Sequence, residues 1–249
     1  MKIELKENEK IDDLELNNLK IIQNKDWFCF GMDSVILSDF AKNIKNNSNI
    51  IDLGTGTGIL PILLSQKTNA KKLVGIEIQN DVANMAQRSI YLNNLEDKIE
   101  IICEDLKNIK KTYENKTFDV VVTNPPYKKI GTGITNENEN KLISRHEITA
   151  NLEDFISASS YLLKDLGTLY MVNRAERLVD VICLLKKYKI EPKEIIFVQP
   201  KQNKEPNIFL IKAVKCAKPF LKINKPIFVY DENGSYSQEI LKIYGKDNK

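Results

Sequence analysis

A strand, a glycine-rich loop and a helix follow one another within residues 49–64. The segment Asn49-Ile50-Ile51-Asp52-Leu53 is typical of a buried strand, and the apolar run at 59–64 is typical of a helix packed against it. Gly54, Gly56 and Gly58 lie between the two runs, and glycines let backbone amides approach a ligand closely. A helix N-terminus also favours a negatively charged group such as a carboxylate. This order of segments indicates an α/β fold whose ligand lies at the carboxyl end of a strand.

Acidic residues mark the ends of three predicted strands. Asp52 lies in the strand before the glycine loop, Glu77 ends a strand at 72–77, and Asp105 follows a strand at 98–103. Glu77 comes 19 residues after Gly58, where a carboxylate can accept hydrogen bonds from both hydroxyls of a ribose. The glycine spacing is GxGxG rather than the GxGxxG of dinucleotide sites, and Asp52 repels a pyrophosphate but attracts an ammonium group. The pattern therefore favours S-adenosylmethionine, whose tail is an amino acid, over NAD.

Asp105 and Leu106 extend this interpretation to the adenine of the cofactor. A carboxylate at this position can accept from the exocyclic amine of an adenine, and Leu106 can pack beside the ring. A single aspartate after a strand is more often a turn or a helix cap. Its third place in a series of acidic strand ends favours the binding role.

The segment Thr123-Asn124-Pro125-Pro126-Tyr127 follows a β-branched strand at 118–122. Two prolines end the strand, so Asn124 and Tyr127 are expected at its carboxyl edge. The side-chain oxygen of Asn124 and the carbonyl of Pro125 can accept both hydrogens of a planar amine and draw its nitrogen toward sp3 geometry. Tyr127 offers a flat face on which the ring that carries the amine can stack. The alternative is a plain turn, since Asn-Pro often ends a strand.

The flanking segments predict an N-terminal extension at 1–30 and one main domain at 31–249. Within the extension, 14–16 and 19–23 are candidate short strands. Asp33 or Ser34 is expected to cap the helix that follows, and a contact between Asp33 and a ligand stays open. Further strands are expected at 167–172, 194–200, 207–212 and 227–230, and a short helix around 240–244. The short connection between 194–200 and 207–212 predicts an antiparallel hairpin at the sheet edge.

Composition describes a globular chain of 249 residues that can bury one substantial core. The net charge is +3 and the pI about 8.5, which permits an acidic partner without requiring one. Because 33 of the 37 basic residues are lysine, a bias typical of AT-rich genomes, the basic charge is weak evidence for nucleic-acid binding.

Three negative expectations follow from the same composition. The four cysteines are far apart and the chain has one histidine, so we expect no metal site. No apolar run approaches the ~20 residues of a membrane span, and the N-terminus lacks the apolar core of a signal peptide. We therefore expect a cytoplasmic protein with no membrane partner, and the compact layout favours a monomer.

The glycine loop, the acidic strand ends, the Asn-Pro-Pro-Tyr motif and the closing hairpin together resemble the class I S-adenosylmethionine-dependent methyltransferases. Within that class the motif is similar to that of amino methyltransferases acting on adenine, guanine or glutamine nitrogens. Two further segments, at 28–37 and 144–147, resemble the bacterial tRNA1(Val) (adenine(37)-N6)-methyltransferase family. The resemblance implies a Rossmann-like, seven-stranded and mostly parallel sheet in the order 3-2-1-4-5-7-6, with helices on both faces.

Motifs and resemblance together assign the candidate site residues to three groups. Catalytic roles are expected for Asn124, Pro125 and Tyr127. Contacts to S-adenosylmethionine are expected for Asp33, Asp52, Gly54, Gly56, Gly58, Glu77, Ile78, Asp105, Leu106 and Asn124. The resemblance implies that the amino acid tail lies near Asp52, Gly54 and Gly56, the ribose on Glu77, and the adenine beside Asp105 and Leu106. Substrate contacts are expected for Pro126, Tyr127, Arg145 and His146, of which the last two have either a positioning role or only a place at a helix start.

The expected reaction is N6-methylation of an adenine in tRNA, which the resemblance implies is position 37 beside the anticodon of a valine tRNA. A flipped adenine stacks on Tyr127, donates its amine hydrogens to Asn124 and the Pro125 carbonyl, and attacks the methyl group in line. Two alternatives change the substrate, to N2 of a guanine in ribosomal RNA or to a glutamine side chain in a translation factor. Release-factor glutamine methyltransferases typically carry an N-terminal helical domain, and only about 50 residues precede the glycine loop here. A third alternative, RNA binding without catalysis, is opposed by the intact motif.

Overall fold

The structure, a computed structural model, describes residues 3–27, 30–127 and 150–246. Within these residues nine strands form one mixed sheet, and two further strands form a separate hairpin. The strands are β1 (Glu9–Asp13), β2 (Lys20–Asn24), β3 (Asn49–Leu53), β4 (Lys72–Glu77), β5 (Ile99–Cys103), β6 (Phe118–Thr123), β7 (Leu163–Arg174), β8 (Ile190–Gln199), β9 (Ile208–Lys215), β10 (Lys222–Ile223) and β11 (Ile227–Phe228). The helices are α1 (Met32–Phe40), α2 (Ile59–Lys67), α3 (Asn80–Leu92), η1 (Leu106–Asn108), α4 (Ile109–Thr112), α6 (Leu152–Leu162), η2 (Ala175–Arg177), α7 (Leu178–Lys187) and α8 (Gln238–Ile243).

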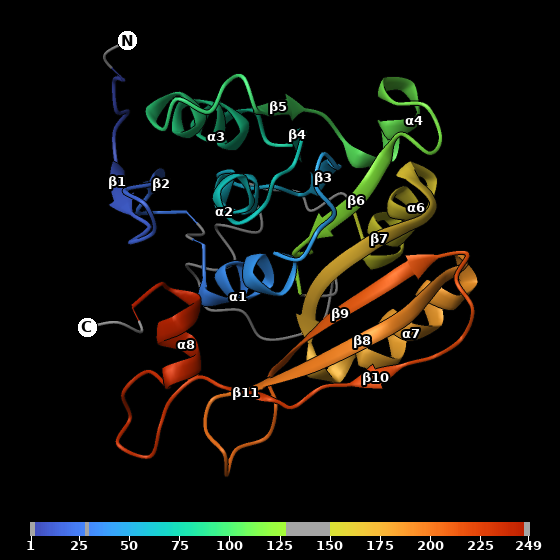
Figure 1. The fold of residues 1–249 in the computed structure, drawn as a ribbon. Helices are drawn as coiled ribbons and strands as arrows, with labels where there is room; N and C mark the ends of the chain where they lie inside the picture. The colour runs from blue at the N-terminus through green and yellow to red at the C-terminus, as the bar shows by residue number, and fades with distance from the viewer. Residues whose placement is uncertain (1–2, 28–29, 128–149, 247–249) are drawn as a thin grey trace.

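The nine-stranded sheet has the order β10-β8-β9-β7-β6-β3-β4-β5, and β11 also pairs with β8 (Figure 1). Strands β3 to β7 are parallel, whereas β9 is antiparallel to both β7 and β8. From β5 to β8 this is the predicted order 3-2-1-4-5-7-6, so the Rossmann-like architecture is confirmed. The prediction of seven strands is two short, because β10 and β11 pair with the outer edge of β8 and cover it.

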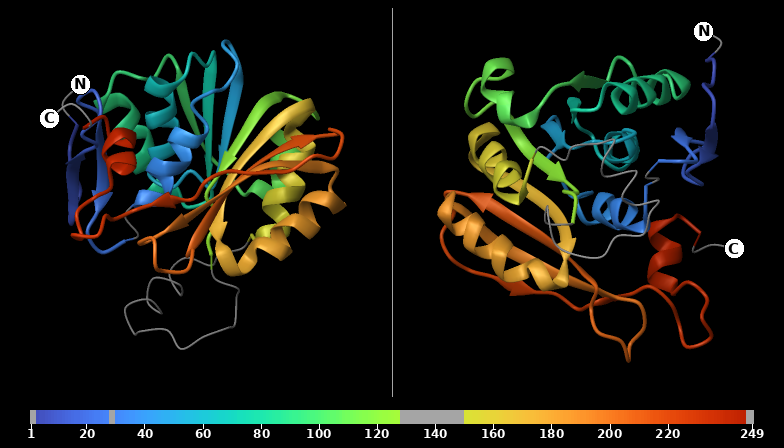
Figure 2. Two further views of the ribbon diagram at one scale, coloured as in Figure 1. Left: turned by 60° about the horizontal axis from the view of Figure 1, so that its bottom comes forward. Right: turned by 180° about the vertical axis from the view of Figure 1, so that it is seen from behind.

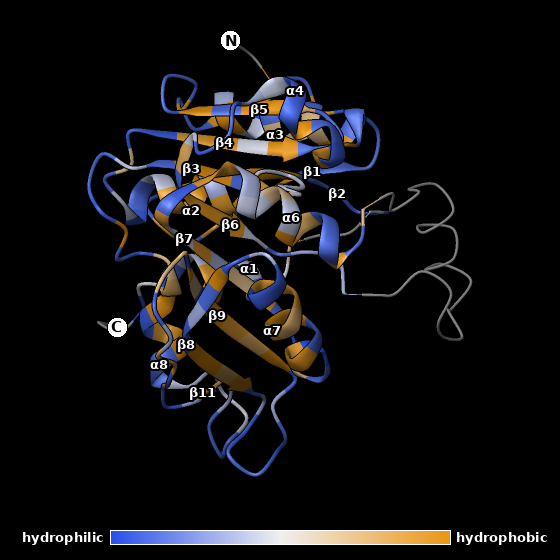
Figure 3. Cartoon of the chain, turned by 90° about the vertical axis from the view of Figure 1, so that its right-hand side faces the viewer, coloured by the Kyte–Doolittle hydropathy of each residue, from blue (hydrophilic) through white to orange (hydrophobic). Residues whose placement is uncertain are grey.

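Helices cover both faces of the sheet. Figure 2 shows α1, α2 and α3 on one face, and α6 and α7 on the other. Two clusters of buried apolar side chains fill the layers, one including residues of α1 and α2, the other residues of α6 and α7. Because both faces are covered, β3 and β6 are almost completely buried and most of their residues are apolar, with Asp52 in β3 and Asp119 in β6 as the charged exceptions. Figure 3 accordingly shows hydrophobic colour along the strands and hydrophilic colour on the connecting loops.

The N-terminal hairpin of β1 and β2 packs against α3 (Figure 1). Ile21 and Ile22 are fully buried, and the Ile22 amide donates to Ser89 Oγ of α3 at 2.9 Å. The predicted strand at 19–23 is confirmed by β2. The predicted strand at 14–16 is wrong, because Glu15 has a left-handed φ of +54° and lies in the turn between β1 and β2.

Helix α1 begins without a side-chain cap. Its N-cap residue is Gly31, in extended backbone, so the prediction that Asp33 or Ser34 caps the helix is wrong. Both residues lie in the first turn, where their side chains bond to the Asn-Pro-Pro-Tyr motif instead of the helix backbone. These side chains therefore make tertiary hydrogen bonds, whereas a capping rule predicts a local bond within their own helix.

Candidate active site

The parallel strands bring the predicted site residues to one edge of the sheet. In the register of the sheet, Asp52 of β3 lies between Gly75 of β4 and Val122 of β6. The carboxyl ends of β3, β4 and β6 are therefore adjacent, and with them the glycine loop, Glu77 and the Asn-Pro-Pro-Tyr motif. This is the edge at which open α/β sheets bind ligands.

The glycine loop is held by the neighbouring strand and is open above. Gly54, Gly56 and Gly58 all have positive φ, a backbone that side chains rarely adopt. The Gly54 amide donates to the Ile76 carbonyl at 3.0 Å, and the Gly56 amide donates to Glu77 Oε2 at 3.0 Å. A methyl group added at Gly56 meets no atom within 4 Å. The loop therefore leaves space for a ligand beside Gly56.

Asp52 is a buried carboxylate without a partner. Its side chain is 1% exposed, and among the described residues neither of its oxygens has a hydrogen-bond partner. Burial, with repulsion from Glu77, raises the pKa of Asp52 to about 7. The nearby Thr55 hydroxyl opposes this shift only in part, and its placement does not complete a hydrogen bond. A cationic ligand at this point supplies the partner that the carboxylate lacks.

Glu77 lies beside Asp52 with both oxygens engaged by backbone. Oε2 accepts from Gly56 and Oε1 accepts from the Gln79 amide at 2.9 Å. Burial raises the pKa of Glu77, and these backbone amides oppose the shift. Each oxygen keeps a lone pair for a ligand hydroxyl. Ile78, the next residue, is 40% exposed although it is apolar, so it is available to cover a ligand ring.

Asp105 caps the short helix η1. Its Oδ1 accepts from the Lys107 amide at 2.9 Å, while Leu106 is buried. The capping role that competes with adenine binding is therefore present in the structure. The second oxygen, Oδ2, is not used by that cap.

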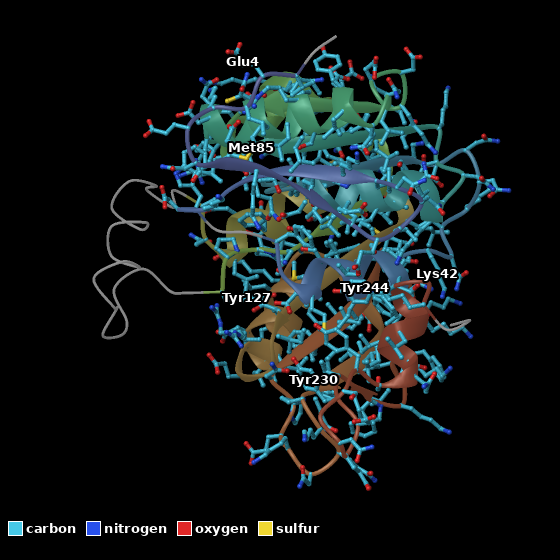
Figure 4. The ribbon with its side chains drawn as sticks, turned by 90° about the vertical axis from the view of Figure 1, so that its left-hand side faces the viewer. Glu4, Lys42, Met85, Tyr127, Tyr230 and Tyr244 are labelled. Atoms are coloured by element: carbon cyan, nitrogen blue, oxygen red, sulfur yellow. The ribbon has the colours of Figure 1, made fainter. Side chains whose placement is uncertain are left out.

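The Asn-Pro-Pro-Tyr motif is held by the first turn of α1. Asn124 Nδ2 donates to Ser34 Oγ at 3.2 Å, and the Tyr127 hydroxyl donates to Asp33 Oδ2 at 2.6 Å. Tyr127 is labelled in Figure 4, where it lies next to α1. Pro125 is buried, whereas Pro126 is exposed. The plain-turn interpretation does not account for two polar side chains directed at one helix.

Arg174 joins the site from the end of β7. Its guanidinium carbon lies 5.2 Å from the centroid of the Tyr127 ring, a cation–π contact. Burial and the Asp33 carboxylate raise the pKa of Tyr127, so the phenol stays protonated and donates. The sequence interpretation missed Arg174 and missed Ser34 as a partner of Asn124. The strand order contained the signal for Arg174, because β7 is parallel to β6 and ends at the same edge.

A model of one protein family, described as the methyltransferase small domain, matches residues 30–188. The chain belongs to the methyltransferase small domain family. Two relatives carry the name tRNA1(Val) (adenine(37)-N6)-methyltransferase. The protein from Porphyromonas gingivalis is 26% identical over 220 residues, with 86% of each chain covered. The protein from Haemophilus influenzae is 25% identical over 224 residues, with 90% of this chain and 92% of the relative covered.

The fold of this methyltransferase has solved counterparts. An Agrobacterium tumefaciens protein, described as a predicted O-methyltransferase, superimposes with a TM-score of 0.69 at 18% identity. The match covers 87% of this chain and 97% of that protein. At this identity the likeness shows the shared fold.

Several predictions on this methyltransferase lie beyond the described residues or concern absences. Arg145 and His146 lie outside the described residues. In the described ranges, no group of three or more histidine, cysteine, aspartate or glutamate residues is arranged to hold a metal ion. The described helices include none with the length and apolar content of a membrane span.

Proposed function

We propose that this methyltransferase transfers a methyl group from S-adenosylmethionine to N6 of an adenine in tRNA, at position 37 beside the anticodon of a valine tRNA. The observation that carries the proposal is the joint position of Asn124 and Tyr127, directed by α1 at the sheet edge that also holds the unpaired Asp52. The names of the relatives from Porphyromonas gingivalis and Haemophilus influenzae support the choice of substrate.

The residues at the edge fit the proposed cofactor. The unpaired carboxylate of Asp52 is a partner for the ammonium of the amino acid tail, and the space beside Gly56 admits that tail. Glu77 would hold the ribose hydroxyls with its remaining lone pairs. Ile78, Leu106 and Asp105 would hold the adenine. Gly54, Gly58, Asp33 and Asn124 complete the predicted set of cofactor contacts.

The residues of this chain act on the adenine N6 amine, which they orient for attack on the methyl group. When bound, S-adenosylmethionine supplies a methyl group activated by a sulfonium sulfur. The Asn124 side-chain oxygen and the Pro125 carbonyl accept the two amine hydrogens, which localises the nitrogen lone pair. Tyr127 stacks on the adenine ring, and Pro126, Arg145 and His146 are the further predicted substrate contacts. No strong base is needed, because the proton can leave after the transfer.

Three broader predictions accompany the proposal. The catalytic domain is predicted to comprise residues 31–249, of which the family model covers the part up to residue 188. The cytoplasmic location and the monomeric state stay predictions from composition and layout. Guanine N2 and a glutamine side chain are the alternative acceptors, and the names of the relatives do not favour either.

Methyl transfer to unmodified total tRNA, followed by nucleoside analysis, tests the proposal. Labelled S-adenosylmethionine should place label in N6-methyladenosine, and mapping should locate it at position 37 of a valine tRNA. Label in N2-methylguanosine, or in a translation factor offered in parallel, would replace this substrate with the corresponding alternative. Absence of label in every acceptor, with cofactor binding intact, would remove the proposed activity.

Substitutions in the motif should separate the two catalytic roles. Asn124→Ala removes an acceptor that acts on the reacting amine, so we expect turnover to fall by roughly 100-fold or more. Tyr127→Ala removes base stacking worth ~1–3 kcal/mol, so we expect a smaller loss. Asn115→Ala, in the exposed turn at the amino end of β6, and Tyr91→Ala, at an exposed position of α3, are controls and should keep normal activity. Full activity of Asn124→Ala would refute the mechanism.

A further inference from the structure

We propose that Asp33 and Ser34, neighbours in the first turn of α1, are positioning residues that orient Tyr127 and Asn124 for methyl transfer. The inference rests on the proposed function and extends it to residues outside the motif. It also gives Asp33 a second role beside the predicted cofactor contact.

Ser34 accepts a hydrogen bond from the nitrogen end of the Asn124 amide, and we infer that this contact holds the amide with its oxygen toward the substrate. A side-chain amide has a donating nitrogen and an accepting oxygen, and only the oxygen can receive an amine hydrogen. Nδ2 donates to Ser34 Oγ at 3.2 Å, so the accepting end is left for the substrate. Ser34 is 4% exposed, which shields this bond from competing water. If the amide were reversed, the Asn124 NH2 group would face the substrate amine, and two hydrogen-bond donors would meet.

Asp33 restrains the Tyr127 ring. The Tyr127 phenol donates to Asp33 Oδ2 at 2.6 Å. A hydrogen bond to an ionised carboxylate is stronger than one between two neutral groups. This bond fixes one end of the side chain, and Arg174 lies over the ring at 5.2 Å. The face on which the adenine is to stack is therefore oriented before the substrate arrives. Preorganisation of this kind is what lowers the cost of reaching a reactive geometry.

Helix α1 is a firm support for these two contacts. Val35, Ile36 and Leu37 directly after them are buried in the core on one face of the sheet. The two bonds join positions 90 and 94 residues apart in the chain. Two adjacent side chains thus control the two functional side chains of the motif.

Single variants of Ser34 test the amide orientation. Ser34→Ala should lower kcat roughly 10- to 100-fold while KM for tRNA and the Kd of S-adenosylmethionine stay near wild type, since Asn124 acts on the amine during transfer. Ser34→Thr keeps the hydroxyl and should restore part of the rate. Ser38→Ala is the matched control, because Ser38 is equally buried in α1 but donates to the Val35 carbonyl of its own helix. Equal kcat values for Ser34→Ala and Ser38→Ala would overturn this part of the inference.

A double-mutant cycle tests the bond between Asp33 and Tyr127. Asp33→Ala and Tyr127→Phe should each lower kcat, and the double variant should lose little more than either one. Asp33→Asn keeps an acceptor for the phenol and should lose less than Asp33→Ala. Additive losses in kcat overturn the positioning role, and so does a change in Asp33→Ala confined to the Kd of S-adenosylmethionine.

Urea unfolding of the same four proteins keeps this test separate from the proposed function. If the wild type binds cofactor but methylates no RNA, the proposed function has failed. The urea midpoints of the four proteins still measure the coupling between Asp33 and Tyr127. Non-additive midpoints support the contact in solution, whereas additive midpoints overturn it.

Discussion

Asp52 illustrates how a binding residue can weaken the fold that contains it. The folded, ligand-free chain buries this carboxylate without a hydrogen-bond partner among the described residues, which raises its pKa from 3.8 to about 7. The folded state therefore holds a proton that the unfolded chain releases as the pH rises from about 4 to 7. The contribution of Asp52 to the free energy of unfolding is therefore fully present below about pH 4 and is lost as the pH rises to about 7. The same burial that lowers the stability of the ligand-free protein lets the Asp52 carboxylate interact strongly with an ammonium group, because water does not compete there.

Asp52→Asn should stabilise the ligand-free protein and abolish tight cofactor binding. At pH 8 we expect a gain on the order of 1–4 kcal/mol in the free energy of unfolding, because a buried charge is removed. At pH 5 the gain should be smaller, since wild-type Asp52 is then protonated. Urea unfolding at both pH values and calorimetric titration with S-adenosylmethionine measure the two effects.

The wild-type protein supplies the control for this substitution. Its affinity for S-adenosylmethionine should increase from pH 5 to pH 7 as Asp52 ionises while the α-amino group of the ligand stays protonated, whereas that of Asp52→Asn should be weak throughout. An unchanged affinity in Asp52→Asn would show that the ammonium lies elsewhere.

Two glycines of the loop between β3 and α2 differ in how much space an added side chain would find. Gly54 and Gly56 both have positive φ, +72° and +57°. A methyl group at Gly54 lies 3.1 Å from the Phe155 ring, whereas one at Gly56 meets nothing within 4 Å. Gly54 therefore serves the packing of α6 on the loop, and Gly56 leaves ligand space.

Gly54→Ala and Gly56→Ala should separate stability from binding. Gly56→Ala should lose roughly 1–2 kcal/mol of stability, the cost of a left-handed backbone, and lose cofactor binding almost completely. Gly54→Ala should lose roughly 2–4 kcal/mol, because crowding against Phe155 adds to that cost. Unfolding curves and calorimetric titration of both variants measure this difference.

Gly234→Ala is the matched control for backbone strain. Gly234 has a φ of +86° in the turn before α8, and an added methyl group there is uncrowded. The variant should lose as much stability as Gly56→Ala but bind S-adenosylmethionine normally. If Gly56→Ala also binds normally, the ligand does not occupy the space beside the loop.

The N-terminal hairpin is joined to the main domain by a two-point ion pair. Arg88 of α3 donates to the two carboxylate oxygens of Glu9 in β1, at 2.7 Å and 2.5 Å, and the Glu9 side chain is 3% exposed. The Arg88 guanidinium lowers the pKa of Glu9. With the burial of Ile21 and Ile22, this pair indicates that residues 3–27 fold together with the domain that follows.

Arg88→Ala should therefore destabilise the entire protein. We expect a loss of roughly 1.5–3 kcal/mol in one cooperative transition, because the buried Glu9 carboxylate loses charge-assisted hydrogen bonds. Amide hydrogen exchange in β1 and β2 should accelerate. Lys72→Ala, which breaks an exposed ion pair with Glu100, is the control and should have little effect. A separate early transition of the hairpin would show that the extension folds independently.

Local patterns predicted most of the architecture and the identity of the site residues. Continuous apolar runs indicate strands buried on both faces, and the run before Asn124 became β6. Closely spaced glycines between two apolar segments indicate a loop, and Gly58 became the N-cap of α2. The chain order of these segments, through the resemblance, predicted the strand order that brings Asp52, Glu77 and Asn124 to one edge. These properties depend on residues within a few positions of one another, or on strand direction.

Side-chain partnerships between distant segments required the tertiary structure. Ser34 meets Asn124 and Asp33 meets Tyr127 only because α1 packs on the sheet with its first turn at the carboxyl edge. A capping rule assigned Asp33 or Ser34 to the N-terminus of its own helix, since such a rule considers only neighbours in the chain. Arg174 reaches Tyr127 because β7 pairs in parallel with β6. Composition and spacing specify backbone conformation and burial, whereas the choice of partner depends on the relative placement of packed layers.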